Sequence, residues 1–198
     1  MARPRKASDE QVFAAMQRVM QRRTPAELTL GEIAREARVT AGALVQRFGS
    51  KRELMLALFA RAAAGTADLF RELETSGRSP LAVLRAYADC TAALANTPAS
   101  LAHNLYYLQL DLTDPAFGHL ARTQARTARR EVQRLLNKAV RAGELRQDAD
   151  TAGLAQLVEA TIGGSLMSWG FYQQRDAKRW VRRHLALALK PYLKKGRA

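Results

Sequence analysis

Apolar residues recur along the chain at intervals of three and four positions, which is the spacing of one face of an α-helix. Ser8 and Gln11 form a capping box just before the first such run. That run consists of Val12, Phe13, Met16, Val19 and Met20. Alternating β-branched runs and Asn-Gly turns, which are typical of strands and hairpins, do not appear. The pattern therefore predicts an all-α protein of about nine helices.

Two short helices are predicted after the first one. Thr29 and Glu32 form a capping box for a helix over residues 30–37, and Thr40 can cap another over 41–47. Two short helices joined by a turn of three or four residues form a helix-turn-helix, which in DNA-binding proteins places its second helix in the major groove.

A long fourth helix and a break indicate two domains. A third capping box, at Ser50, begins a helix that continues to about Leu73. The clearest break is TSGRSP at 75–80. We expect a three-helix N-terminal domain over 7–67, joined by the fourth helix to a C-terminal helical domain over 68–198.

The predicted helix over 41–47 has one large inward residue, Leu44, so small and polar side chains face outward. Small residues let a helix enter a major groove without clashes. Gln46 can pair with adenine, Arg47 can pair with guanine or a phosphate, and Val45 can touch a thymine methyl. The alternative is an ordinary helical hairpin with a solvated face.

Phosphate contact is expected at the start of the fourth helix, where free N–H groups and the Lys51 amine meet. The full set of predicted DNA-contacting residues is Thr29, Thr40, Ala41, Gly42, Ala43, Val45, Gln46, Arg47, Ser50 and Lys51.

The charge of the chain favours a polyanionic partner. There are 32 Lys and Arg against 18 Asp and Glu, a net charge of +14. Nucleic acid and anionic membrane attract such a chain, although an arginine-rich proteome also explains it. The arm that carries Arg3, Arg5 and Lys6 either follows the DNA backbone or minor groove or is a disordered tail.

The remaining composition points to the cytoplasm. A lone cysteine, Cys90, allows no internal disulfide and fits a reducing compartment. The N-terminus lacks the apolar run of a signal peptide, and no stretch reaches the length of a membrane span. We expect a soluble cytoplasmic protein without a membrane partner.

The stretch LTLGEIAREARVTAGALVQRFGSKRELMLALFARA resembles the N-terminal domain of the TetR family of transcriptional repressors, most strongly over residues 8–65. The resemblance implies an all-α homodimer that docks residues 41–47 in the major groove. It also implies a C-terminal domain that senses a small molecule. Two reading helices about 34 Å apart would require palindromic operator DNA.

Four positions compare with the family pattern in informative ways. Arg38 stands where the family usually has a turn glycine, at a cost of about 1 kcal/mol for a left-handed residue. Val45 and Arg47 stand where the family often has aromatic residues that contact phosphates. Lys51 matches the family lysine, and the resemblance gives it a phosphate contact.

Candidate effector contacts are sought in the C-terminal half. Tyr and His residues there suit a ligand pocket, because their side chains combine an apolar body with a polar tip. The candidates are Tyr87, Cys90, His103, Tyr106, Tyr107, Leu110, Phe117, Met167, Trp169 and Phe171. Ordinary core packing is the alternative for each. No cofactor and no metal are expected, since the three histidines share no ligand spacing with Cys90.

The last two predicted helices are the expected dimer interface. Gly163 and Gly164 lie within the first of these helices. Each glycine costs about 1 kcal/mol of helix stability relative to alanine, and a close approach of two helices would explain why glycine is present. The combined prediction is a ligand-responsive homodimeric repressor and not an enzyme. Two alternatives are a helix-turn-helix activator or DNA-organising protein without ligand sensing, and an all-α enzyme that uses the face of His103, Tyr106 and Tyr107.

Overall fold

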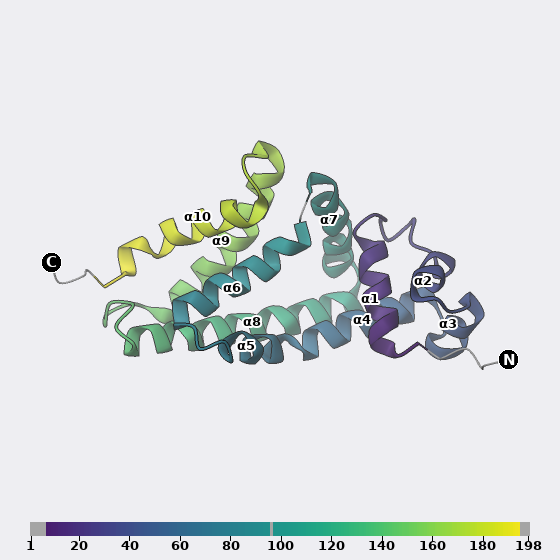
Figure 1. The fold of residues 1–198 in the computed structure, drawn as a ribbon, viewed down its shortest axis with the longest axis horizontal. Coiled ribbons are helices and arrows are strands. Elements are labelled where there is room, and N and C mark those ends of the chain that lie inside the picture. The colour runs from purple at the N-terminus through teal and green to yellow at the C-terminus, as the bar shows by residue number, and fades with distance from the viewer. Residues whose placement is uncertain (1–6, 96, 195–198) are drawn as a thin grey trace. The chain divides into compact units, whose positions relative to one another are not determined.

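The computed structural model describes residues 7–95 and 97–194, and these residues are almost entirely helical (Figure 1). The predicted all-α class is confirmed. Ten α-helices occur among the described residues, one more than the number expected, and two β-residues form only an isolated bridge. The basic arm at Arg3, Arg5 and Lys6 lies outside the described residues. The helices are α1 Asp9–Met20, α2 Leu30–Ala37, α3 Ala41–Phe48, α4 Lys51–Ala64, α5 Thr66–Glu74, α6 Pro80–Ala92, α7 Pro98–Thr113, α8 Pro115–Arg141, α9 Thr151–Tyr172 and α10 Ala177–Leu189.

The additional helix arises because the predicted long fourth helix is interrupted. Helix α4 ends at Ala64, Gly65 has φ −78° and ψ −2°, and α5 begins at Thr66. A ψ near 0° departs from the helical value of about −42°. Glycine is a poor helix former, and the apolar periodicity runs through this position without marking it.

The described residues form two compact units that do not follow the chain order. Unit 1 comprises residues 1–62 and 102–121, and unit 2 comprises 63–101 and 122–198. Most of α7, from residue 102 onward, and the start of α8 therefore belong to unit 1. The division into functional domains at 7–67 and 68–198 remains a prediction.

Unit 1 is built on the packing of α1 against α2 and of α2 against α3 (Figure 1). Ile33 and Leu44 are buried together with apolar residues of α1 and α4. Tyr107 and Phe117, from the second segment of the unit, belong to the same core. The Phe117 ring meets the Phe59 ring edge-on with centroids 5.3 Å apart.

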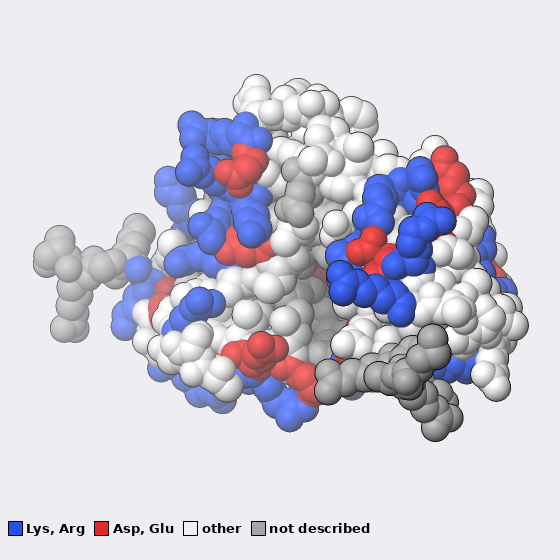
Figure 2. All heavy atoms as spheres, turned by 45° about the vertical axis from the view of Figure 1, so that its right-hand side comes forward, with Lys and Arg blue, Asp and Glu red and all other residues white. Residues whose placement is uncertain are grey.

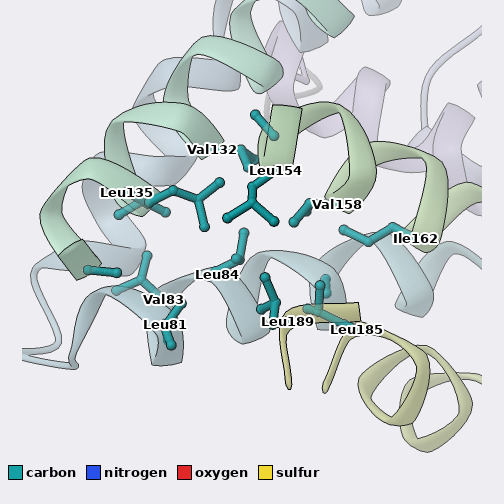
Figure 3. Packing of buried hydrophobic residues seen from close by; sticks show 14 of the residues in the cluster. Leu81, Val83, Leu84, Val132, Leu135, Leu154, Val158, Ile162, Leu185 and Leu189 are labelled. Atoms are coloured by element: carbon teal, nitrogen blue, oxygen red, sulfur yellow. The ribbon is translucent and has the colours of Figure 1, made fainter. Parts of the chain in front are cut away.

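Unit 2 has its own core, formed by α6, α8, α9 and α10 (Figure 3). Leu84, Leu135, Val158 and Leu185 point from these four helices into one interior (Figure 3). Asp150 caps α9 by accepting hydrogen bonds from two backbone N–H groups. Among the described residues, no helix has the length and apolar character needed to cross a membrane.

Candidate DNA interface

The turn between α2 and α3 is held by a left-handed residue. Arg38 has φ 57° and ψ 42°, and the Val39 N–H donates to the Ala34 carbonyl at 2.9 Å. A left-handed arginine costs about 1–2 kcal/mol because of contact between Cβ and the backbone. The structure therefore confirms the expected conformation at the position where the family usually has glycine.

Helix α3 exposes nearly all of its side chains. Leu44 is 2% exposed and anchors the helix to the unit 1 core, whereas Val45 is 49% exposed. Thr40, Ala41, Gly42, Ala43, Gln46 and Arg47 are also exposed. The face expected to enter a major groove is thus largely exposed, although Arg47 on it contacts Asp9 of α1. That these residues touch DNA remains a prediction.

The two threonines of the predicted set are helix caps. Thr40 Oγ1 accepts from the Ala43 N–H at 3.1 Å, and Thr29 Oγ1 accepts from the Glu32 N–H at 3.2 Å. The Thr29 hydroxyl also donates to the Glu32 carboxylate at 3.2 Å. Thr40 consequently keeps its hydroxyl proton available for an external acceptor, whereas Thr29 uses its proton within the protein.

Arg47 is engaged inside unit 1. Its Nη1 donates to the Ala7 carbonyl at 2.6 Å, its Nη2 forms an ion pair with Asp9, and its guanidinium lies over the Phe48 ring. These contacts tie α3 to the start of α1. Helical spacing suggested a base or phosphate for Arg47, because it gives no signal for partners 38 and 40 positions away.

Lys51 also has an internal partner. Its Nζ donates to the Pro25 carbonyl at 2.9 Å, which fixes the loop between α1 and α2. An ammonium group has three donors, so two remain for an anion. Ser50 Oγ accepts from the Glu53 N–H at 3.1 Å and caps the same helix.

Ion pairs use basic residues of α1 and of the loop after it. Arg18 and Arg22 both bind Glu36, and Arg23 binds Glu32. These hydrogen bonds lower the pKa of Glu36 and of Glu32, so both carboxylates stay charged at neutral pH. The charges that remain for a polyanion are consequently fewer than a residue count suggests.

One further candidate for DNA contact was not predicted. Arg38 is exposed immediately before α3, and no acidic partner for it occurs among the described residues. The sequence reasoning considered Arg38 only for its backbone conformation. Its position in the helix-turn-helix turn is the signal that would have identified it.

The predicted effector contacts are shared between the two units, and their role as effector contacts remains a prediction. Unit 1 contains His103, Tyr106, Tyr107, Leu110 and Phe117, and unit 2 contains Tyr87, Cys90, Met167, Trp169 and Phe171. Two hollows, one beside α3 and one beside α6, are lined by other residues.

Several of these candidates have structural roles. Burial raises the pKa of Tyr107, and its neutral hydroxyl donates to the Arg23 carbonyl at 3.0 Å. Trp169 is buried and donates from Nε1 to the Arg175 carbonyl at 3.2 Å. Phe171, in contrast, is 81% exposed. Core packing, the alternative stated for each candidate, describes Tyr107 and Trp169.

Two polar atoms on α7 stand out from this packing. His103 Nδ1 and Asp111 Oδ1 are buried without a hydrogen-bond partner among the described residues. Burial also raises the pKa of Asp111 to about 6. Asp111 was not predicted, because periodicity gives no signal for a buried carboxylate. No group of three or more potential metal ligands is found among the described residues.

Comparison with known proteins agrees with the geometry of unit 1. A family model described as "Bacterial regulatory proteins, tetR family" matches residues 13–58. A second, described as "Tetracyclin repressor-like, C-terminal domain", matches residues 107–185, and together the two models match more than half of the chain. No curated protein matches the chain.

Solved structures share the fold. SmeT, the repressor of the Stenotrophomonas maltophilia multidrug efflux pump SmeDEF, is 24% identical with a TM-score of 0.68, covering 96% of this chain and 93% of that chain. A TetR transcription regulator from Haloarcula marismortui is 18% identical with a TM-score of 0.75, covering 93% and 97%. A SmeT–triclosan complex is 23% identical with a TM-score of 0.68, covering 96% and 94%. With a helix-turn-helix in unit 1 and both family models matched, the chain belongs to the TetR family of helix-turn-helix transcriptional regulators.

Proposed function

We propose that the protein is a homodimeric repressor that reads a palindromic operator through α3 and is released by a small-molecule effector. The exposure of α3 is the observation that supports DNA binding. Leu44 is the only buried residue of this helix. A helix of small and polar residues can approach base edges closely. The protein acts in the cytoplasm, where bacterial DNA lies.

The dimer would form on the outer face of α9. Leu157, Ala160, Gly164, Met167 and Phe171 follow one another at intervals of three and four residues, and all five are exposed. An added Cβ at Gly164 would meet nothing within 4 Å, so packing inside the chain does not explain this glycine. A second copy would explain both features, because small residues allow two helices to approach closely and the apolar neighbours would then be buried.

A route for the effector response lies within unit 1. Tyr107 on α7 contacts the loop before α2 through the Arg23 carbonyl. At the start of α8, Asp114 accepts two hydrogen bonds from Arg52 of α4, at 2.8 and 3.0 Å. Displacement of α7 and the start of α8 by an effector would therefore move the elements that support α3. An effector that binds one arrangement better than the other shifts the population between them.

DNA binding is tested with a fluorescent fragment of the intergenic region beside the gene, by mobility shift and by anisotropy. Gln46→Ala is expected to weaken operator binding by about 1–3 kcal/mol and to reduce discrimination between sequences. Lys51→Ala is expected to weaken binding to all sequences and to lower the salt dependence by about one phosphate contact.

Arg126→Ala is the matched control, since it removes one exposed cation from unit 2 and leaves α3 and α4 intact. Operator binding that is the same in Gln46→Ala, Lys51→Ala and the wild type would refute the assigned surface. Equal losses of operator affinity in Lys51→Ala and Arg126→Ala would point instead to nonspecific electrostatic attraction between DNA and the net positive charge of the protein. Deletion of the gene should raise transcription of the neighbouring gene if the protein is a repressor and lower it if the protein is an activator.

A further inference from the structure

The excess positive charge lies mostly outside the unit that carries the helix-turn-helix. Unit 2 contains 20 of the 32 Lys and Arg residues and 10 of the 18 Asp and Glu residues, whereas unit 1 contains the other 12 and 8. Unit 2 therefore carries +10 of the net +14. Basic side chains gather on the part of unit 2 that includes α10, with acidic atoms among them (Figure 2). This charge needs an explanation other than contact between α3 and DNA.

A hollow of about 310 Å³ lies between α6 and α10 in this basic region. Its lining residues are Arg78, Ala82, Arg85, Ala86, Asp89 and Arg182. The first five follow one side of α6 and the residues just before it, at helical spacing, and Arg182 comes from α10. Two of the lining residues are alanines, whose short side chains take up little of the space between the arginines.

Asp89 positions one of the three arginines. Arg182 Nε donates to Asp89 Oδ1 at 2.6 Å, and Arg182 Nη2 pairs with Oδ2 of the same carboxylate. The Asp89 side chain is 20% exposed, whereas that of Arg182 is 56% exposed. The bidentate pair fixes the guanidinium plane while its outer N–H groups still face solvent.

The other two arginines have no such partner. Arg78 and Arg85 line the hollow, and neither forms a hydrogen bond or ion pair with any residue that the structure describes. Three arginines against one aspartate leave two positive charges in excess. A bound anion would offset this excess of positive charge around the hollow.

We propose that this hollow binds a small anion that carries phosphate groups. Guanidinium groups bind phosphate oxygens in a bidentate manner, and several arginines around one pocket favour a ligand with more than one negative charge. The volume is at the lower end of the range for small-molecule sites. A DNA duplex is too wide to enter it. This inference does not depend on the proposed repressor function.

The test measures binding of inorganic pyrophosphate to the full-length protein by calorimetry at constant ionic strength. The double variant Arg78→Ala/Arg85→Ala is compared with Arg122→Ala/Arg126→Ala, which removes two exposed arginines of unit 2 away from the hollow. We expect the first variant to bind at least about tenfold more weakly and the second to stay within about twofold of the wild type. Thermal unfolding and operator binding are followed in parallel to show that both variants fold.

Vesicles that contain phosphatidylinositol phosphate distinguish a lipid headgroup from a free phosphate compound. Binding to either probe that is lost only in Arg78→Ala/Arg85→Ala supports the site and identifies the source of the phosphate. Equal losses in both double variants would overturn the proposal in favour of diffuse attraction. Absence of binding to both probes would also overturn the proposal. So would an Arg78→Ala/Arg85→Ala variant that loses operator binding but binds both probes as the wild type does. Because operator binding is measured separately, failure of this site leaves the repressor proposal untouched.

Discussion

Glu74 at the end of α5 is the centre of the strongest charge cluster in unit 2, and its removal should destabilise the protein. Its carboxylate accepts from Arg134 at 2.7 and 3.1 Å and from Lys138 Nζ at 2.6 Å. Glu131 holds the same arginine at 2.7 Å. The hydrogen bond from Arg134, followed by that from Lys138, lowers the pKa of Glu74 from 4.5 to about 2. We predict that Glu74→Gln lowers the free energy of unfolding.

The magnitude follows from the pKa and the exposure of the cluster. The lowered pKa of Glu74 corresponds to a ceiling of about 3 kcal/mol. The side chains of Glu74, Arg134 and Lys138 are 23%, 35% and 43% exposed, so water and salt screen part of this energy. About 1–2 kcal/mol remains. For a chain of this size, that loss lowers the melting temperature by about 3–6 °C.

The pH dependence has a definite sign. Because the folded pKa of Glu74 lies below the unfolded value, its contribution is complete above about pH 4.5 and is lost as the pH falls toward 2. Thermal unfolding is measured for wild type and Glu74→Gln at pH 7 and near pH 2.5, at one protein concentration. The difference in melting temperature should be largest at pH 7 and should shrink at low pH.

Glu72→Gln is the matched control, because Glu72 lies exposed on the same helix and no ion pair of its carboxylate is found among the described residues. It should change the melting temperature by less than about 1 °C. Equal effects of Glu72→Gln and Glu74→Gln at pH 7, or a gap that stays constant between pH 7 and pH 2.5, would refute the reasoning.

Three further predictions follow from single residues. Arg38→Gly should raise the melting temperature by about 1–3 °C, because glycine adopts the left-handed turn without strain, whereas Arg35→Gly in α2 should lower it; a decrease for both would show that the turn is not strained. Tyr107→Phe should cost about 1 kcal/mol in chemical denaturation, since the Arg23 carbonyl loses its donor, and an unchanged midpoint would contradict that contact. Gly164→Arg should yield a monomer in light scattering with helical circular dichroism retained, and a persistent dimer would exclude the α9 face.

The elements that could be predicted are those whose cause is local in the sequence. The capping box of Ser8 and Gln11 is present as expected, and Thr29 and Thr40 cap α2 and α3 over three residues. Such bonds form within one helical turn, so residue spacing determines them. The exposure of α3 follows from the same kind of reasoning, because only Leu44 lies on the inward side of that helix.

The parts that could not be predicted depend on contacts between segments far apart in the chain. Arg47 binds Asp9, Lys51 binds the Pro25 carbonyl, and α7 packs into unit 1. Helical periodicity shows which side of a helix is apolar but not which other helix covers it. For this reason, the sequence did not show that Tyr107 and Phe117 share the core of unit 1, whereas Trp169 belongs to unit 2.

Net charge, like helical periodicity, does not show where residues lie in the folded protein. A charge of +14 is a sum over the chain, and it supports DNA binding only if the cations lie beside α3. In unit 1, three arginines are paired with Glu32 and Glu36, and Arg47 is paired with Asp9. Among the described residues that directly flank α3 in the sequence, Arg38 and Lys51 are the cations without an acidic partner. We therefore expect the fit of α3 to base edges to supply much of the specificity for an operator.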